Sequence, residues 1–74
     1  MKINKFEDVE NTWAMIMTAP LEIDPISKSI TLRQLFDVLA SNGLVPATGE
    51  GFKKLRDHVQ IMREIGMVLP VILN

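Results

Sequence analysis

The stretch GFKKLRDHVQIMREIGMVLPVILN, residues 51–74, carries most of the fold information in this 74-residue chain. In its first part, apolar residues recur at the spacing of one helix face, namely Phe52, Leu55, Val59 and Met62. This periodicity predicts an amphipathic helix over residues 52–65. Gly66 directly after it suits the left-handed conformation that ends many helices. We therefore expect a helix that buries one face and exposes the other.

The apolar and β-branched run after this helix predicts a strand over Met67–Leu73. Pro70 has no N–H to donate to a sheet ladder, which places it at a sheet edge or at a bulge. Two partners for this strand remain open. One is a short strand near residues 29–31, and the other is a strand of a second subunit, because an unpaired apolar edge is a template for pairing.

Two more helices are predicted upstream. Asn4 and Glu7 form a capping-box pattern that opens a helix running to about Thr18, and Thr31 with Gln34 opens a second one. Asn42–Gly43 closes that second helix, and the Pro- and Gly-containing residues 44–51 predict a loop. The chain is therefore expected to form one small domain over residues 1–74, mainly α with short β (an α+β fold). It would have three helices and a C-terminal strand.

Composition narrows the classes of protein. The chain has no cysteine, which fits a reducing cytoplasm, and no apolar run approaches the roughly 20 residues of a membrane span. One histidine, no cysteine and no tyrosine leave little from which to build a catalytic site or a metal site. We therefore expect a cytoplasmic protein that is not an enzyme and has no metal or cofactor. His58 is interpreted as a packing residue at the edge of the apolar face.

Charge is distributed unevenly along the chain, although the net value is only −1. Residues 1–24 hold two basic and five acidic residues, whereas residues 25–74 hold six basic and four acidic ones. Much of the positive charge falls on helix 52–65. Its candidate DNA-contacting residues are Lys53, Lys54, Arg56, Gln60 and Arg63.

Lys53, Arg56, Gln60 and Arg63 have the spacing of one helix face, away from the apolar one. Arginine reads guanine with two hydrogen bonds, glutamine reads adenine, and lysine binds phosphate. The alternative is a solvated surface face, because Asp57 and Glu64 dilute the positive charge. Taken alone, helix 52–65 favours the solvated surface face.

The segment from His58 to Val68, HVQIMREIGMV, fits a pattern that often ends the third helix of one DNA-binding family. The pattern is His-(Leu/Val)-x-x-(Leu/Met)-x-x-x-Gly-(Leu/Met)-Val, where x is any residue. In this segment and in element order, residues 29–70 resemble the winged helix-turn-helix family. The resemblance implies that residues 31–40 form the supporting helix, that residues 52–65 form the recognition helix and that Met67–Leu73 leads into a wing. Two features differ from the family: the link from Ser41 to Gly51 has eleven residues rather than about three or four, and the sequence reaches Asn74 with at most half a wing.

These observations lead to a first hypothesis and a rival. The first is a small sequence-specific DNA-binding protein, a transcriptional or mobile-element regulator that acts as a homodimer and reads DNA with helix 52–65. The rival is a protein–protein interaction or oligomerisation module that binds no nucleic acid and docks a protein partner. Its candidate interface residues are Trp13, Met67, Val68, Leu69 and Val71.

Overall fold

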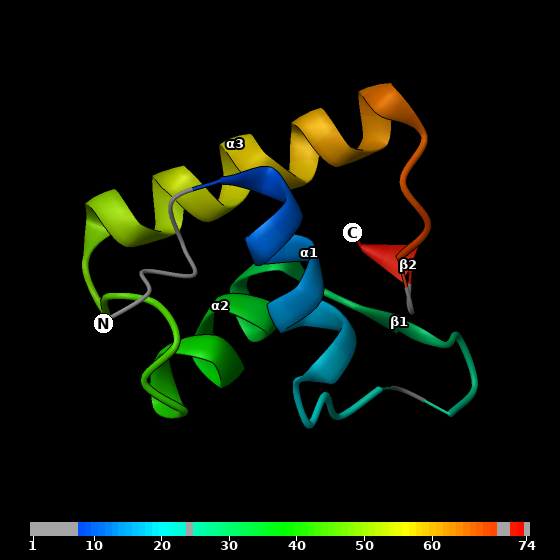
Figure 1. Ribbon diagram of the computed structural model, residues 1–74. Coiled ribbons are helices and arrows are strands. Elements are labelled where there is room, and N and C mark those ends of the chain that lie inside the picture. The colour runs from blue at the N-terminus through cyan, green and yellow to red at the C-terminus, as the bar shows by residue number, and fades with distance from the viewer. Residues whose placement is uncertain (1–7, 24, 70–71, 74) are drawn as a thin grey trace.

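The computed structural model describes residues 8–23, 25–69 and 72–73. In chain order, the described residues form α1 (Val9–Thr18), β1 (Ser29–Ile30), α2 (Leu32–Ser41), α3 (Gly49–Ile65) and β2 (Ile72–Leu73). The expected fold class, mainly α with short β, is confirmed. Figure 1 shows α3 lying across one side of the molecule, with α1 and α2 together on its inner side and the two strands beside them.

The first helix is capped by Asp8. Its carboxylate accepts a hydrogen bond from the backbone N–H of Asn11 at 2.8 Å, which satisfies one of the free donors at the helix start. The predicted capping residues Asn4 and Glu7 lie outside the described residues. Within the described part, α1 begins at Val9.

The capping box predicted for the second helix is confirmed. The Thr31 hydroxyl accepts from the backbone N–H of Gln34, and the Gln34 side chain accepts from the backbone N–H of Thr31, each at 3.0 Å. At the other end, Gly43 has a φ of 71°, the left-handed conformation that glycine adopts at low cost. The short strand expected near residues 29–31 is present as β1, directly before this cap.

The third helix begins three residues earlier than the apolar periodicity predicted, at Gly49 instead of Phe52. Its N-cap is Thr48, whose hydroxyl accepts from the backbone N–H of Gly51 at 3.1 Å. Gly51 packs tightly on the preceding loop, because a Cβ built there would lie 2.2 Å from the carbonyl oxygen of Pro46. The glycines therefore belong to the helix, and the link between α2 and α3 shortens to residues 42–48.

The strand predicted over Met67–Leu73 is wrong in its extent. Gly66 ends α3 with a φ of 79°, and the N–H of Met67 still bonds to the carbonyl of Met62 at 2.9 Å. Residues 67–69 then run without regular structure, Pro70 and Val71 lie outside the described residues, and only Ile72–Leu73 forms a strand. The helix-ending turn accounts for the loss at the start of the predicted strand, because it keeps the N–H of Met67 bonded to α3.

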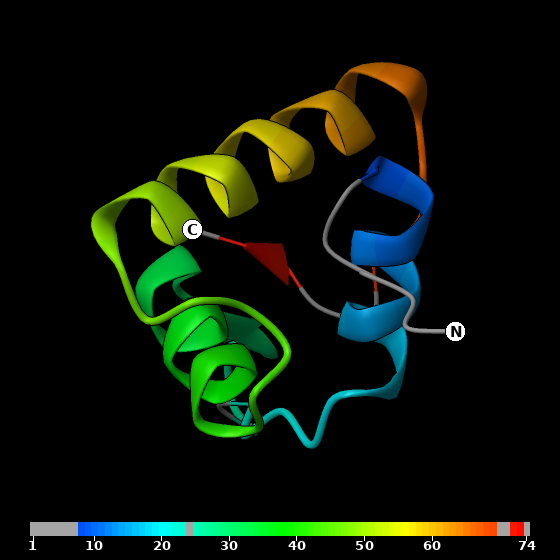
Figure 2. The same ribbon diagram turned by 60° about the vertical axis from the view of Figure 1, so that its left-hand side comes forward.

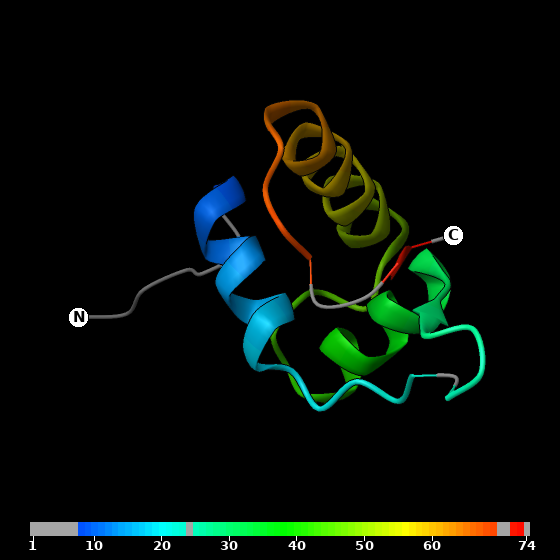
Figure 3. The same cartoon turned by 90° about the vertical axis from the view of Figure 1, so that its right-hand side faces the viewer.

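The strand finds its partner within the chain. β2 pairs with β1 in parallel, with Ser29 opposite Ile72 and Ile30 opposite Leu73. Figure 3 shows residues 66–69 running back from the end of α3 into the body of the molecule. In the described residues the sheet has these two strands only, so the wing implied by the family resemblance, a hairpin of antiparallel strands, is not formed there.

One hydrophobic core joins all five elements. Its buried members are Met15, Ile16, Ile30, Leu35, Phe36, Leu39, Val45, Leu55, Val59, Met62 and Leu73. The side chains from α3 in this group, Leu55, Val59 and Met62, recur at helical spacing, as the sequence predicted. Burying this face fixes which side of α3 remains exposed to solvent.

Candidate nucleic-acid interface

The candidate interface is the outer face of α3. Figure 2 shows this helix on the periphery of the molecule, with the remaining elements on one side of it. The side chains that share this face are exposed; we call them the basic stripe, consisting of Lys53, Arg56, Gln60 and Arg63. At 3.6 residues per turn these four fall within an arc of about 80°. The structure thus brings together four of the five residues that the sequence predicted to contact DNA.

Lys54 is placed apart from the other four. It is half-buried and follows Lys53 by one residue, which turns its side chain about 100° around the helix. That rotation carries it to the flank of α3 that also holds Ile61 and Ile65. Lys53 and Lys54 are therefore neighbours in sequence that point toward different surfaces.

The opposite edge of α3 is fixed by contacts with α1. The imidazole Nδ1 of His58 lies 2.6 Å from the hydroxyl oxygen of Thr12, and both side chains are buried. The same hydroxyl oxygen lies 3.0 Å from the carbonyl oxygen of Asp8. This contact anchors His58 in the α1–α3 interface, in agreement with its interpretation as a packing residue. The buried Thr12 was not singled out from the sequence.

A further cation lies beside the basic stripe, and sequence reasoning missed it. The guanidinium carbon of Arg33, in the first turn of α2, lies 6.0 Å from the centre of the Phe52 ring. That ring packs edge-on against Phe36 with centroids 5.3 Å apart, which joins α2 to the start of α3. Locally, Arg33 is an ordinary partner of Asp37 at 3.6 Å on α2. No local pattern signals its approach to α3, because the contact forms only when the helices pack.

Acidic residues border the stripe without interrupting it. Asp57 and Glu64 lie about 20–40° beyond Lys53, on the side away from Arg56 and Arg63. A carboxylate oxygen of Asp57 is 4.0 Å from the guanidinium of Arg56, and both side chains are more than half exposed. Such a pair contributes little, because water and salt screen it. Arg56 can therefore exchange this partner for a phosphate or a base.

Arg63 is held more firmly than the other members of the stripe. Its guanidinium donates a hydrogen bond to the carbonyl oxygen of Leu73 in β2. The contact connects the last turn of α3 to the strand that completes the sheet. Arg63 therefore has a structural role in addition to any role in binding.

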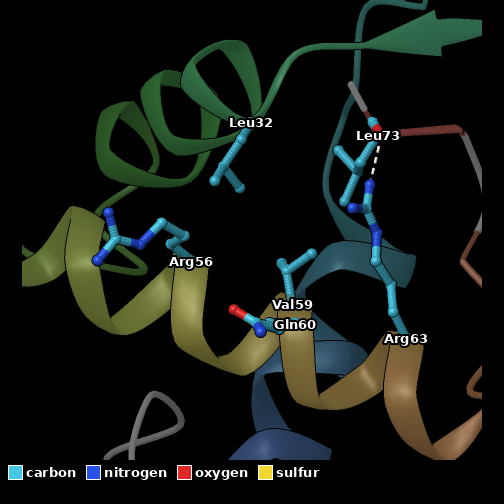
Figure 4. Close-up of a pocket in the computed structure, with 6 residues that line it drawn as sticks. All are labelled: Leu32, Arg56, Val59, Gln60, Arg63 and Leu73. Carbon is cyan, nitrogen blue, oxygen red and sulfur yellow. Dashed lines mark hydrogen bonds between the residues drawn. The ribbon is translucent and has the colours of Figure 1, made fainter.

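A cavity of about 350 Å³ opens beside the stripe, between α3, the start of α2 and β2. It is lined by Leu32, Arg56, Val59, Gln60, Arg63 and Leu73. Figure 4 shows Arg56 and Arg63 at opposite ends of this group, with Gln60 between them and Arg63 reaching up to Leu73. Three members of the basic stripe thus form one wall of the cavity, and the other described residues that line it, Leu32, Val59 and Leu73, are aliphatic.

The described residues predicted for a protein interface lie on α1 and in the segment directly after α3, away from the basic stripe. The indole N–H of Trp13 donates to the carbonyl of Val68 at 2.6 Å, so α1 holds the segment after α3 in place. Trp13, Met67 and Leu69 are half-buried against the core, whereas Val68 is 74% exposed. Val71, also predicted for the interface, lies outside the described residues.

Within the described residues, no group of three or more histidine, cysteine, aspartate or glutamate side chains is placed to hold a metal ion. Likewise, none of the three helices in the described part has the length and apolar character needed to cross a membrane.

Comparisons with known proteins add no family assignment. No protein-family model matches the chain, and neither the curated proteins nor the solved structures include a match to it.

Proposed function

We propose that this chain binds duplex DNA through the outer face of α3 and acts in the cytoplasm as a small regulator of transcription or of a mobile element. One observation carries the proposal: Lys53, Arg56, Gln60 and Arg63 share the exposed face of a peripheral helix. An α-helix fits the major groove, and these side-chain types include donors for phosphate oxygens and for base edges. The resemblance to winged helix-turn-helix proteins supports the same use of this helix.

The contacts expected from each residue differ. Lys53 and Arg33, at the start of α3 and of α2, are suited to bind phosphates, because both lie toward one end of the stripe. Arg56 and Gln60, near the middle of the helix, are suited to contact base edges. Arg63 contributes positive charge, but its bond to Leu73 restricts its reach. We therefore expect Arg56 and Gln60 to determine sequence preference.

A matched pair of substitutions tests this proposal. Lys53→Gln and Lys54→Gln remove the same charge from adjacent positions, but only Lys53 lies on the basic stripe. Fluorescence anisotropy with a mixed pool of labelled duplexes at low salt should show Lys53→Gln binding roughly fivefold more weakly than the unmodified protein, as expected for loss of a contact worth about 1 kcal/mol. Lys54→Gln should bind almost normally. Circular dichroism of both variants should show unchanged helix content.

Two results would contradict the proposal. If the unmodified protein binds no duplex at about 50 mM salt, where phosphate contacts are strong, α3 is not a DNA-binding helix. If both lysine variants weaken binding equally, the attraction is a diffuse charge effect and the outer face of α3 is not the interface.

The observation that favours self-association is a group of exposed apolar side chains around the end of α3. Ile65 is 64% exposed, Val68 is 74% exposed, and Ile61 lies one turn before Ile65 on the same flank. This flank faces away from the basic stripe, so a second copy of the chain bound there would leave both stripes accessible. We therefore expect a homodimer whose contact includes Val68 beside Trp13 and the isoleucines of α3.

Sedimentation velocity over a range of protein concentrations tests the dimer. Ile65→Glu should shift the protein toward monomer, because it places a charge inside an apolar contact. Ile26→Glu is the matched control, since Ile26 is even more exposed but belongs to the turn before β1. A protein that sediments as a monomer at all concentrations, or one in which both variants act alike, would contradict a contact at the end of α3.

A further inference from the structure

The cavity between α2, β2 and α3 has a chemical character that DNA binding does not require. Leu32, Val59 and Leu73 come from three different elements, and in Figure 4 they lie around the same space. The polar members of its lining, Arg56, Gln60 and Arg63, all come from α3. The cavity therefore combines an aliphatic surface with a cationic rim, and among the described residues that line it none is acidic.

The rim is partly preorganised for an anion. The bond from Arg63 to the Leu73 carbonyl uses one of the five N–H donors of a guanidinium and fixes the position of the others. Arg56, at the other end, pairs within the described part of the chain with the exposed Asp57, at 4.0 Å. Gln60 adds an amide N–H between them. A carboxylate bound near Arg63 and Gln60 would receive hydrogen bonds from groups already in place. Arg56, which Figure 4 shows pointing away from Gln60, would have to leave Asp57 and turn toward the carboxylate.

The cavity discriminates among classes of ligand. An organic cation would be repelled by two guanidinium groups. A neutral apolar molecule would cover those groups without pairing them, which is unfavourable. Inorganic phosphate would satisfy the rim but leave the aliphatic side chains uncovered. A monoanion with a short branched aliphatic body satisfies both parts, and a cavity of about 350 Å³ lies in the size range of small-molecule sites.

We propose that this cavity binds a small carboxylic acid with a branched aliphatic body, with the carboxylate at the rim formed by Arg56, Gln60 and Arg63 and the aliphatic part against Leu32, Val59 and Leu73. The proposed acid site does not depend on DNA binding, because the residues that line the cavity already lie together in the free protein. Occupation of the rim would remove Arg56 and Gln60 from the surface available to another ligand.

The test is an NMR titration of the isotopically labelled protein with 4-methylpentanoate, in the absence of DNA. We expect saturable shifts at the methyl groups of Leu32, Val59 and Leu73, with a Kd on the order of 1 mM, as befits a ligand of few atoms. The neutral isostere 4-methylpentanamide should bind about tenfold more weakly, because it lacks the charge-assisted hydrogen bonds. Acetate, which has the charge without the body, should cause no saturable shift at these methyl groups.

Two charge-removing variants complete the experiment. Arg56→Gln removes a rim guanidinium at an exposed position and should weaken binding of 4-methylpentanoate about tenfold. Lys53→Gln removes the same charge from the basic stripe but not from the cavity, so it should change this affinity by less than about twofold. In DNA binding, by contrast, both variants are expected to be weaker, which separates the acid site from the proposed DNA interface.

The proposal is overturned if no saturable shift occurs, if the amide binds as tightly as the acid, or if Arg56→Gln and Lys53→Gln have equal effects. Shifts confined to Ile61 and Ile65 would also overturn it, because they would place the acid on the exposed apolar flank of α3. None of these results would bear on whether the protein binds duplex DNA.

Discussion

The imidazole Nδ1 of His58 lies 2.6 Å from the hydroxyl oxygen of Thr12, inside the interface between α3 and α1. The same hydroxyl oxygen lies 3.0 Å from the carbonyl oxygen of Asp8. A threonine hydroxyl has only one hydrogen, which it can direct to the Asp8 carbonyl or to an unprotonated Nδ1 of His58, so the tautomer of His58 sets which group donates in this contact. The contact thus links the one histidine of the chain to the first turn of α1 through a single buried hydroxyl.

Replacing Thr12 tests the value of this hydrogen bond. Thr12→Val keeps the shape of the side chain but removes the hydroxyl that contacts both His58 Nδ1 and the Asp8 carbonyl, which should lower the free energy of unfolding by about 1–3 kcal/mol. Thr12→Ser retains the hydroxyl and should lose less. Urea denaturation followed by circular dichroism measures both. Equal stability of the valine variant and the unmodified protein would show that the contact contributes nothing.

The two glycines at the start of α3 should respond in opposite directions to alanine. At Gly51 a Cβ would lie 2.2 Å from the Pro46 carbonyl oxygen, so Gly51→Ala must displace backbone and should destabilise the fold by about 1–3 kcal/mol. At Gly49 nothing lies within 4 Å of an added Cβ. Gly49→Ala should therefore be neutral or stabilising by up to about 1 kcal/mol, because alanine reduces the entropy of the unfolded chain.

The melting temperatures of the two alanine variants, measured in the same buffer, test these opposite effects. Because the chemical change is the same, any effect of alanine on helix propensity is shared, and the difference reports the contact with Pro46. Similar melting temperatures for the two variants would contradict the close packing of Gly51 on the loop.

The salt dependence of DNA binding should count the phosphate contacts. If Lys53 neutralises a phosphate, the slope of log Kd against log salt concentration should fall by about 1 in Lys53→Gln. Gln60→Ala carries no charge change, so it should leave that slope unaltered while reducing the preference for particular duplexes. Anisotropy titrations at several salt concentrations provide both slopes. An unchanged slope in Lys53→Gln would exclude a phosphate contact at this residue.

Arg63 should affect stability more than Arg56. Arg63→Gln removes the donor to the Leu73 carbonyl, and β2 has only two residues with which to hold its place. The N–H of Ile72, which bonds to the carbonyl of Lys28 at 3.4 Å, should then exchange with solvent faster. Arg56→Gln is the matched control. It also removes one guanidinium from the basic stripe, but no hydrogen bond joins Arg56 to β2 among the described residues. Equal exchange rates at Ile72 in the two variants would contradict the coupling.

The elements that sequence reasoning predicted correctly are those with local signals. The capping box of Thr31 and Gln34 involves residues three apart, and Gly66 ends α3 by its own backbone preference. The start of α3 was placed too late, because two glycines suggest a loop when their packing on Pro46 is unknown. Thr48 was the available signal for the true start, since threonine is a preferred N-cap residue.

The parts that could not be predicted depend on contacts between distant residues. The parallel pairing of β1 with β2, the approach of Arg33 to Phe52 and the bond from Arg63 to Leu73 each join different elements. The basic stripe was predictable, because it follows from helical periodicity alone. The cavity beside it was not, because its walls come from three segments that meet only in the folded chain.

The two-residue ladder between β1 and β2 also bears on the order of folding. Its partners are separated by about forty residues, and closing so long a loop carries an entropic cost before any bond is made. The contacts within and between α2 and α3 close shorter loops, so we expect them to form early and the strands to join late. The pairing of β2 with β1 would then be the last step of folding, and α3, which bears the basic stripe, would already be packed against α2.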